Sequence, residues 1–257
     1  MSYLIKYLIL LFFLFRCEYD ENDEVKCTSC CNSCKNHEDQ VYKLTENQDK
    51  CIYCGSIENL TDEHVFPLAL NGSILLTKAC CEPCREITSK CELNPLHENW
   101  IETRAYLNYA SRKSNFDSKI FPLEVTLKDN TKKKLLLKRR ETLGITQFLE
   151  LAIPGFFQKS LYSKGSRVVG ISNYGFGINL NTFVKKYNIK SFSFLIKHKN
   201  NYFETMLAKI AYCLTISTWG AECFSKNFVL PSILLEKDDI GRWVGCDPEG
   251  KILPLLG

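Results

Sequence analysis

Two cysteine pairs in this chain have the spacing of a metal site. Cys51 and Cys54 form the first pair, and Cys81 and Cys84 form the second after 26 intervening residues. Four thiolates are the ligand set of a closed tetrahedral zinc site, and a two-residue gap lets both sulfurs of a pair reach one ion. The spacing predicts a structural Zn2+ ion, with two disulfides or simple buried thiols as the alternatives.

The neighbours of these cysteines bear on the same prediction. Gly55, directly after Cys54, fits the tight turn of a metal knuckle, because glycine accepts a positive φ at little cost. Cys80 stands beside Cys81 and leaves the choice of ligand open. We prefer Cys81 because it restores the CxxC spacing.

An acidic pair and a histidine lie between the two cysteine pairs, at Asp62, Glu63 and His64. A lone histidine is more often a structural or surface residue. Here its position next to two acids and between two knuckles favours chemistry. The constellation indicates a nuclease.

The elements that must position these residues can be predicted from the same segment. They are a short strand ending at His64, a turn at Asn71-Gly72, a returning strand over 73–76 and a helix over 84–92. The expected order is strand, strand, helix.

With this order the segment resembles the HNH endonuclease family, in the branch whose ββα-metal finger is clamped by two CxxC pairs around a Glu-His-x-x-Pro segment. The resemblance covers about residues 51–92 and places Glu63, His64 and Pro67 on that segment. It implies that His64 is the general base that activates water and that Glu63 holds a catalytic Mg2+ or Mn2+ ion. A neutral imidazole with a pKa near ~6.5 can take a proton from water, and a carboxylate suits a hard cation.

The segment also departs from the family pattern. Arg85 stands where many members carry the His or Asn that supplies a second metal ligand. A guanidinium remains protonated and cannot ligate a metal, although it could contact phosphate. Glu86 or Glu92 on the predicted helix could replace that ligand, or could belong to a solvated helix face. The family's middle Asn has no clear counterpart over 74–78, where a backbone carbonyl could substitute.

The chain is longer than this finger needs. Its 257 residues, 45% of them hydrophobic, can bury one good core or two modest ones. We expect an α+β fold in which a zinc-clamped ββα-metal finger precedes a C-terminal α+β region. The expected division is a hydrophobic N-terminal segment (1–16), an acidic Cys-rich linker (17–47), the HNH ββα-metal domain (48–94) and a C-terminal region of unknown role (95–257).

Within the C-terminal region the patterns predict a helix over 100–111, a hairpin over 121–137 and a helix over 202–217. The pattern over 206–211 and the later tryptophans resemble the uncharacterised C-terminal region of some bacterial HNH proteins. Lys209 lies in the otherwise apolar last helix. We interpret it as a lysine that snorkels at the edge of the core rather than one that touches nucleic acid.

A net charge of +4 is too mild for a dedicated nucleic-acid binder, so local charge matters more. A basic hairpin edge could hold the phosphate backbone of DNA through Lys132, Lys133, Lys134, Arg139 and Arg140. Lysines on an edge strand also simply prevent aggregation, which is the slightly favoured explanation. No glycine-rich phosphate loop is present, and we expect no small-molecule cofactor.

The N-terminus is nearly all apolar over 3–15 and resembles a signal sequence or short anchor, but it is shorter than the ~18 residues of a membrane span. The fourteen cysteines favour the cytoplasm, where thiolates stay available for zinc. Membrane anchoring or export is the alternative. The cluster Cys27 to Cys34 could hold a second zinc, although it has no distant CxxC partner.

The sequence thus predicts a metal-dependent HNH-type DNA endonuclease with a structural zinc. Two other hypotheses remain. A catalytically degenerate finger, with Arg85 in place of a ligand, would bind nucleic acid or protein without cutting. An exported disulfide protein would contain oxidised CxxC pairs. Specificity is expected to lie in the C-terminal half, because a ββα unit meets mainly the minor groove and backbone.

Overall fold

A computed structural model of the chain describes residues 43–44, 47–109, 116–155, 168–193, 201–224 and 227–246. These residues form helices and mainly antiparallel sheets, and the predicted α+β class is confirmed. The hydrophobic segment over 3–15 and the cluster Cys27 to Cys34 lie outside the described residues. Within the ranges above, no helix is long and apolar enough to span a bilayer.

The ββα order predicted between the cysteine pairs is present. Strand β2 (Leu60–His64) pairs antiparallel with β3 (Ile74–Cys81), and helix α2 (Glu82–Asn94) follows without a break. Asn71 makes the turn with a left-handed φ of 62°. The returning strand is longer than expected, because it continues to Cys81. A two-residue strand, β1 (Lys43–Leu44), lies parallel beside β3.

Helix α2 ends at Asn94, where Pro95 begins a π-helical turn over Pro95–Asn99. Helix α3 (Ile101–Tyr106) follows this turn. The sequence predicted a helix over 100–111, but α3 stops five residues earlier, and Asn108 adopts a left-handed φ of 55° just after it. Asparagine tolerates this conformation better than most residues, so it favours a chain reversal here.

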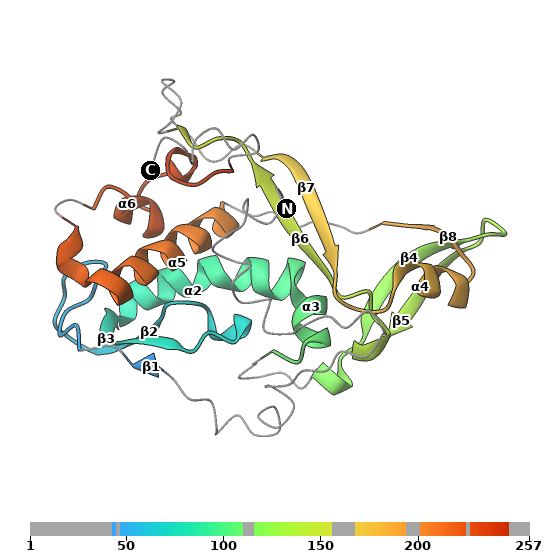
Figure 1. Cartoon of the computed structure of the whole chain (residues 1–257), viewed down its shortest axis with the longest axis horizontal. Coiled ribbons are helices and arrows are strands. Elements are labelled where there is room, and N and C mark those ends of the chain that lie inside the picture. Colours follow the sequence, from blue (N-terminus) through green and yellow to red (C-terminus); the bar gives the residue numbers. More distant parts are fainter. Residues whose placement is uncertain are drawn as a thin grey trace.

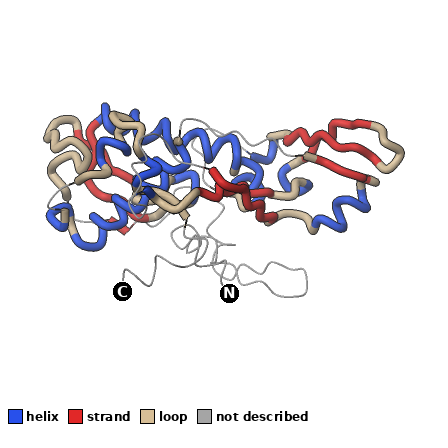
Figure 2. The backbone as a smooth tube through the Cα atoms, turned by 90° about the horizontal axis from the view of Figure 1, so that it is seen from above, coloured by secondary structure: helices blue, strands red, loops and turns tan. Residues whose placement is uncertain are grey.

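The remaining strands form two further sheets. One has the order β5-β4-β8, and the other pairs β6 with β7. The elements are β4 (Phe121–Leu127), β5 (Lys132–Leu137), β6 (Ile145–Leu151), β7 (Val168–Gly175), α4 (Leu180–Lys186) and β8 (Ile189–Phe192). The predicted hairpin is β4 with β5. Figures 1 and 2 show that this three-stranded sheet and the ββα unit lie at opposite ends of an elongated molecule.

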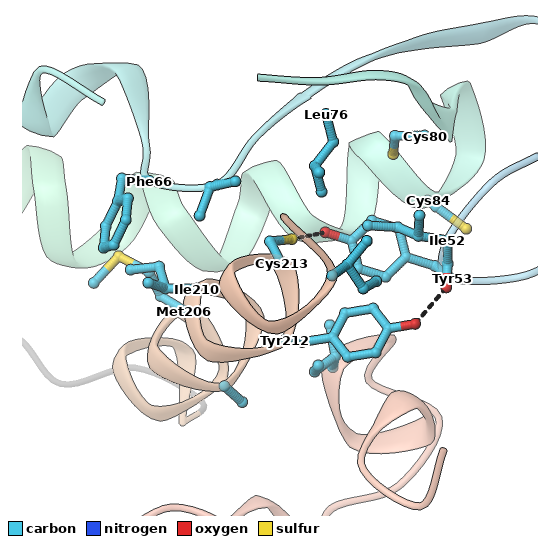
Figure 3. Close-up of a cluster of buried hydrophobic side chains, with 14 of the residues drawn as sticks. Ile52, Tyr53, Phe66, Leu76, Cys80, Cys84, Met206, Ile210, Tyr212 and Cys213 are labelled. Carbon is cyan, nitrogen blue, oxygen red and sulfur yellow. Dashed lines mark hydrogen bonds between the residues drawn. The ribbon is translucent and has the colours of Figure 1, made fainter. Parts of the chain in front are cut away.

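Helix α5 (Tyr202–Trp219) lies beside α2 and covers the ββα unit (Figure 1). It is two residues longer than the predicted helix. Short helix α6 (Leu230–Ile233) packs on α5. One core contains finger and α5 side chains together, including Tyr53, Phe66 and Leu76 from the first and Met206 and Ile210 from the second (Figure 3). The core therefore continues across the expected boundary at residue 94.

Candidate functional site

The four predicted cysteines meet at one point of the finger. The Sγ atoms of Cys51, Cys54, Cys81 and Cys84 all lie within 4.8 Å of one another, and those of Cys54 and Cys81 are 3.5 Å apart. Four sulfurs around one zinc at about 2.3 Å would be about 3.8 Å apart, so the group has nearly the size of a tetrahedral site. These four cysteines could hold a metal ion such as zinc. Cys81, rather than Cys80, joins the group.

Local backbone geometry builds each half of this group. The amide of Gly55 donates a 2.8 Å hydrogen bond to the carbonyl of Cys51, and Gly55 has the expected positive φ of 78°. The second pair uses the junction of two elements. Cys81 ends β3, and Cys84 lies in the first turn of α2, where Pro83 needs no helical hydrogen bond.

The protonation of these thiols suits a cation. A hydrogen bond with Cys80 is the main cause that lowers the pKa of Cys51, to about 3. Burial is the main cause that raises the pKa of Cys81 and of Cys84; hydrogen bonds with neighbouring cysteines add to the rise for Cys84, whereas those of Cys81 with Cys84 oppose it. One thiolate therefore forms readily. Further thiolates in the same partly buried group would repel the first. A metal ion removes that repulsion, because thiolates are its ligands.

None of the nine cysteines in the described ranges forms a disulfide. This includes both CxxC pairs, so the structure has the free thiols that a metal site requires. Among the cysteines of the C-terminal half, Cys213 is buried and Cys246 is partly buried, whereas Cys223 is exposed in a short 3-10 turn after α5.

His64 is the last residue of β2, as predicted, and is half-buried. Its backbone pairs with Leu75 on β3. The imidazole therefore stands where the strand ends and the chain turns towards Pro67. The Nδ1 atom of the imidazole is buried, so Nε2 is the ring nitrogen that could act as a proton acceptor.

Glu63 has a different environment from the one expected for an open metal ligand. It is 5% exposed, and its Oε1 lies 2.5 Å from Nζ of Lys209. The same ammonium contacts Oε1 of Glu92 at 2.7 Å and donates to the carbonyl of His64 at 2.6 Å. Helix α5 thus places a positive charge against the end of β2.

Lys209 was interpreted from the sequence as a snorkelling lysine, and this was wrong. Its side chain is 2% exposed and does not reach solvent. Burial disfavours the charged form, but the carboxylates of Glu63 and Glu92 outweigh it, and the pKa of Lys209 lies well above its usual value. Sequence reasoning missed the pairing of Lys209 with Glu63 and Glu92. A lysine among apolar helix residues was the signal that could have suggested a buried partner.

Of the residues expected on α2, Glu92 joins this cluster through Lys209, whereas Arg85 and Glu86 do not. Arg85 forms a two-pronged salt bridge with Glu82 one turn away, and Glu86 is exposed. Across the part of the chain that the structure describes, the four cysteines are the one group of three or more potential ligands close enough for a common ion. Glu63, His64 and Glu86 do not form such a group.

The basic residues lie far from the cysteines, on and beside the β5-β4-β8 sheet (Figure 1). Lys132, Lys133 and Lys134 are exposed on β5 and line a hollow of about 500 Å³ with Thr126 and Ser191. Arg140 is exposed in the 3-10 turn (Arg139–Glu141) that follows β5. In contrast, Arg139 is held by Asp117 at 3.2 Å and by Asn108. Its guanidinium is already engaged within the protein.

Comparison of this chain with protein-family models, with curated proteins and with solved structures finds no match.

Proposed function

We propose that this protein is an HNH-type, metal-dependent endonuclease that hydrolyses phosphodiester bonds of DNA. One arrangement carries the proposal. A ββα unit, closed at one end by four cysteines, presents a half-buried histidine where its first strand ends. This arrangement joins the motif seen in the sequence to the element order that the family resemblance requires.

In the proposed reaction His64 accepts a proton from the attacking water. The residue is half-buried at the end of β2 and its Nδ1 atom is buried, so Nε2 would be the ring nitrogen that meets a water molecule beside a phosphate. A divalent ion held through the carboxylate of Glu63 would supply charge stabilisation for the phosphate and the leaving oxygen. His64 and Glu63 are adjacent in the sequence, so one short segment would serve both roles.

The cysteine group is proposed as a structural zinc site, separate from this chemistry. A closed set of four thiolates leaves no coordination position for water or substrate. Its contribution would be to join the first knuckle to the strand-helix junction at Cys81. This link through the metal would stabilise β3 and α2, which support β2 and His64.

A second candidate function is a finger that binds nucleic acid or protein without cutting. The specific observation in its favour is the ion pair between Glu63 and Lys209, because an ammonium at 2.5 Å competes with a divalent ion for the same carboxylate. Arg85, in the place of a usual ligand, points the same way. Such a protein would still bind the structural zinc but would not hydrolyse phosphodiester bonds.

DNA is the proposed partner of the endonuclease, and nucleic acid is one of the two partner classes of the second candidate. Lys132, Lys133 and Lys134 on β5 and Arg140 in the turn after it are exposed cations suited to a phosphate backbone. Arg139 contributes less, because Asp117 already neutralises it. Such contacts fix position rather than sequence, and they would bind the duplex away from the finger.

Cleavage of supercoiled plasmid by the full chain, with Mg2+ or Mn2+ and with EDTA, tests the proposal. His64→Ala should abolish metal-dependent nicking and retain one zinc per chain. His97→Ala is the matched control, since His97 is exposed on the π-helical turn and has no proposed role. Nicking by His64→Ala at the wild-type rate would overturn the mechanism. Stoichiometric zinc and DNA binding without nicking would favour the second candidate.

A further inference from the structure

Lys209 connects three elements through one ammonium group. Its Nζ contacts Glu63 and the carbonyl of His64 on β2, and Glu92 on α2, all within 2.7 Å. Lys209 itself comes from α5, 145 residues after His64. A lysine ammonium has three N–H donors, and here three acceptors surround it. The number of acceptors therefore equals the number of N–H donors of the ammonium.

Because this cluster is buried, its ionic contacts are costly to break. Lys209 is 2% exposed and the side chain of Glu63 is 7% exposed, so water screens their attraction weakly. Removing one partner of such a pair leaves an unpaired buried charge, which costs several times more than losing a surface pair. By comparison, Lys50 and Glu222 form a surface pair, 52% and 91% exposed, at 3.2 Å. The buried contacts resist movement of β2 in a way that the surface pair does not.

We propose that Lys209 is a positioning residue for the histidine of the candidate nuclease site. By bonding the carbonyl of His64 and the carboxylate of Glu63, it holds the last residue of β2 in place and sets the direction of the imidazole. This inference rests on the proposed function of His64 as a base. Lys209 does not touch substrate, because its ammonium is enclosed by protein.

The physical reason is that the pairing of β2 with β3 is irregular close to His64. The register of the two strands shifts between Thr61 and Glu63, just before the histidine. Directly after it, the amide of Val65 donates a 3.0 Å hydrogen bond to the carbonyl of Ile74. The bond from Lys209 to the His64 carbonyl adds a restraint from a separate helix. A displacement of about 1 Å in a catalytic group can cost about a hundredfold in rate.

The first test uses the double variant Lys209→Met/Glu92→Gln in the full chain. It removes the ammonium and one of its two carboxylates, so the buried charge left behind is smaller than in Lys209→Met alone. Plasmid cleavage should show kcat lowered about tenfold to a hundredfold with KM within about twofold. Zinc content and a cooperative melting transition establish that the variant is folded. Lys50→Met/Glu222→Gln, which makes the same substitutions in the exposed surface pair, is the matched control and should keep kcat near the wild-type value.

If the double variant fails to fold, Lys209→Arg gives the same test with the charge retained. A guanidinium has a planar arrangement of donors and should satisfy Glu63 without reproducing the bond to the His64 carbonyl. We expect lower kcat, unchanged KM and unchanged zinc content. Wild-type kcat in either folded variant would overturn the positioning role.

A spectroscopic measurement separates this inference from the proposed function. The ring signals of the histidines are recorded by 1H–13C NMR, and that of His64 is assigned by its loss in His64→Ala. In the Lys209 variants the His64 signal should shift or broaden, whereas that of His97 should stay unchanged. An unchanged His64 signal would refute the inference even if the protein cuts DNA. A shifted signal in a protein that never cuts would support the positioning and reject the nuclease.

Discussion

The phenol of Tyr212 on α5 donates a 2.6 Å hydrogen bond to the carbonyl of Ile52, the residue directly after Cys51. The next residue, Cys213, meets the hydroxyl of Tyr53 at 3.2 Å (Figure 3). Two consecutive residues of α5 thus support two consecutive residues of the cysteine knuckle.

Tyr212→Phe should destabilise the protein by about 1–3 kcal/mol, because the carbonyl of Ile52 would stay buried without its donor. Urea unfolding followed by circular dichroism measures the change. Tyr174→Phe is the control, since Tyr174 is 39% exposed on β7 and its ring contact with Phe148 survives the loss of the hydroxyl. Equal stability of both variants would count against a supporting role for α5.

Cys51→Ser should lower bound zinc from one ion per chain to none and unfold the finger, because metal binding and folding are coupled at a four-thiolate site. Atomic absorption and melting curves provide the measurements. Cys80→Ala should retain zinc, since Cys80 lies outside the group. Loss of zinc in Cys80→Ala with retention in Cys81→Ala would show that the wrong neighbour was chosen.

Glu102→Gln should flatten the dependence of stability on pH. Burial raises the pKa of Glu102 from 4.5 to about 7, so the folded state binds the proton more tightly than the unfolded state. The contribution of Glu102 to the free energy of unfolding is fully present below about pH 4.5. It is lost as the pH rises through about 7. Because Glu102 is partly exposed, we expect the variant to gain about 1–2 kcal/mol more at pH 8 than at pH 5.

Unfolding free energies of wild type and Glu102→Gln at the two pH values provide this comparison. Glu58→Gln is the control, because Glu58 is exposed in the loop before β2. An equal effect of Glu102→Gln at pH 5 and pH 8 would contradict the raised pKa.

Replacing Lys132, Lys133 and Lys134 by alanine should weaken DNA binding and make it less sensitive to salt. For every phosphate that the variant no longer neutralises, the slope of log affinity against log salt should become shallower by about 0.9. Fluorescence anisotropy with a labelled duplex over a salt series measures both quantities. The matched triple arginine variant keeps the charge and should bind as wild type does. An unchanged slope in the alanine variant would show that these lysines do not neutralise phosphates. Their role would then be to protect an edge strand from aggregation.

Local patterns in the sequence were sufficient to predict the metal knuckles and the ββα order. CxxC spacing, the glycine after Cys54 and the Asn71-Gly72 turn act over a few residues, so their geometry follows from the chain itself. The choice of Cys81 over Cys80 followed in the same way. The hairpin of β4 and β5 and the helix over 202–217 were also predictable, because apolar periodicity determines which face is buried.

The tertiary structure decided which distant charges meet. Nothing local to Lys209 says that Glu63 and Glu92 lie beside it, since 146 and 117 residues separate them from it in the chain. The same holds for Arg139 and Asp117, whose pairing takes an apparent phosphate contact out of the basic surface. A buried charge is stable only where the fold supplies its partner. The sequence by itself determined the residues that could do chemistry, and the packing of α5 against the finger decided the surroundings of Glu63 and His64.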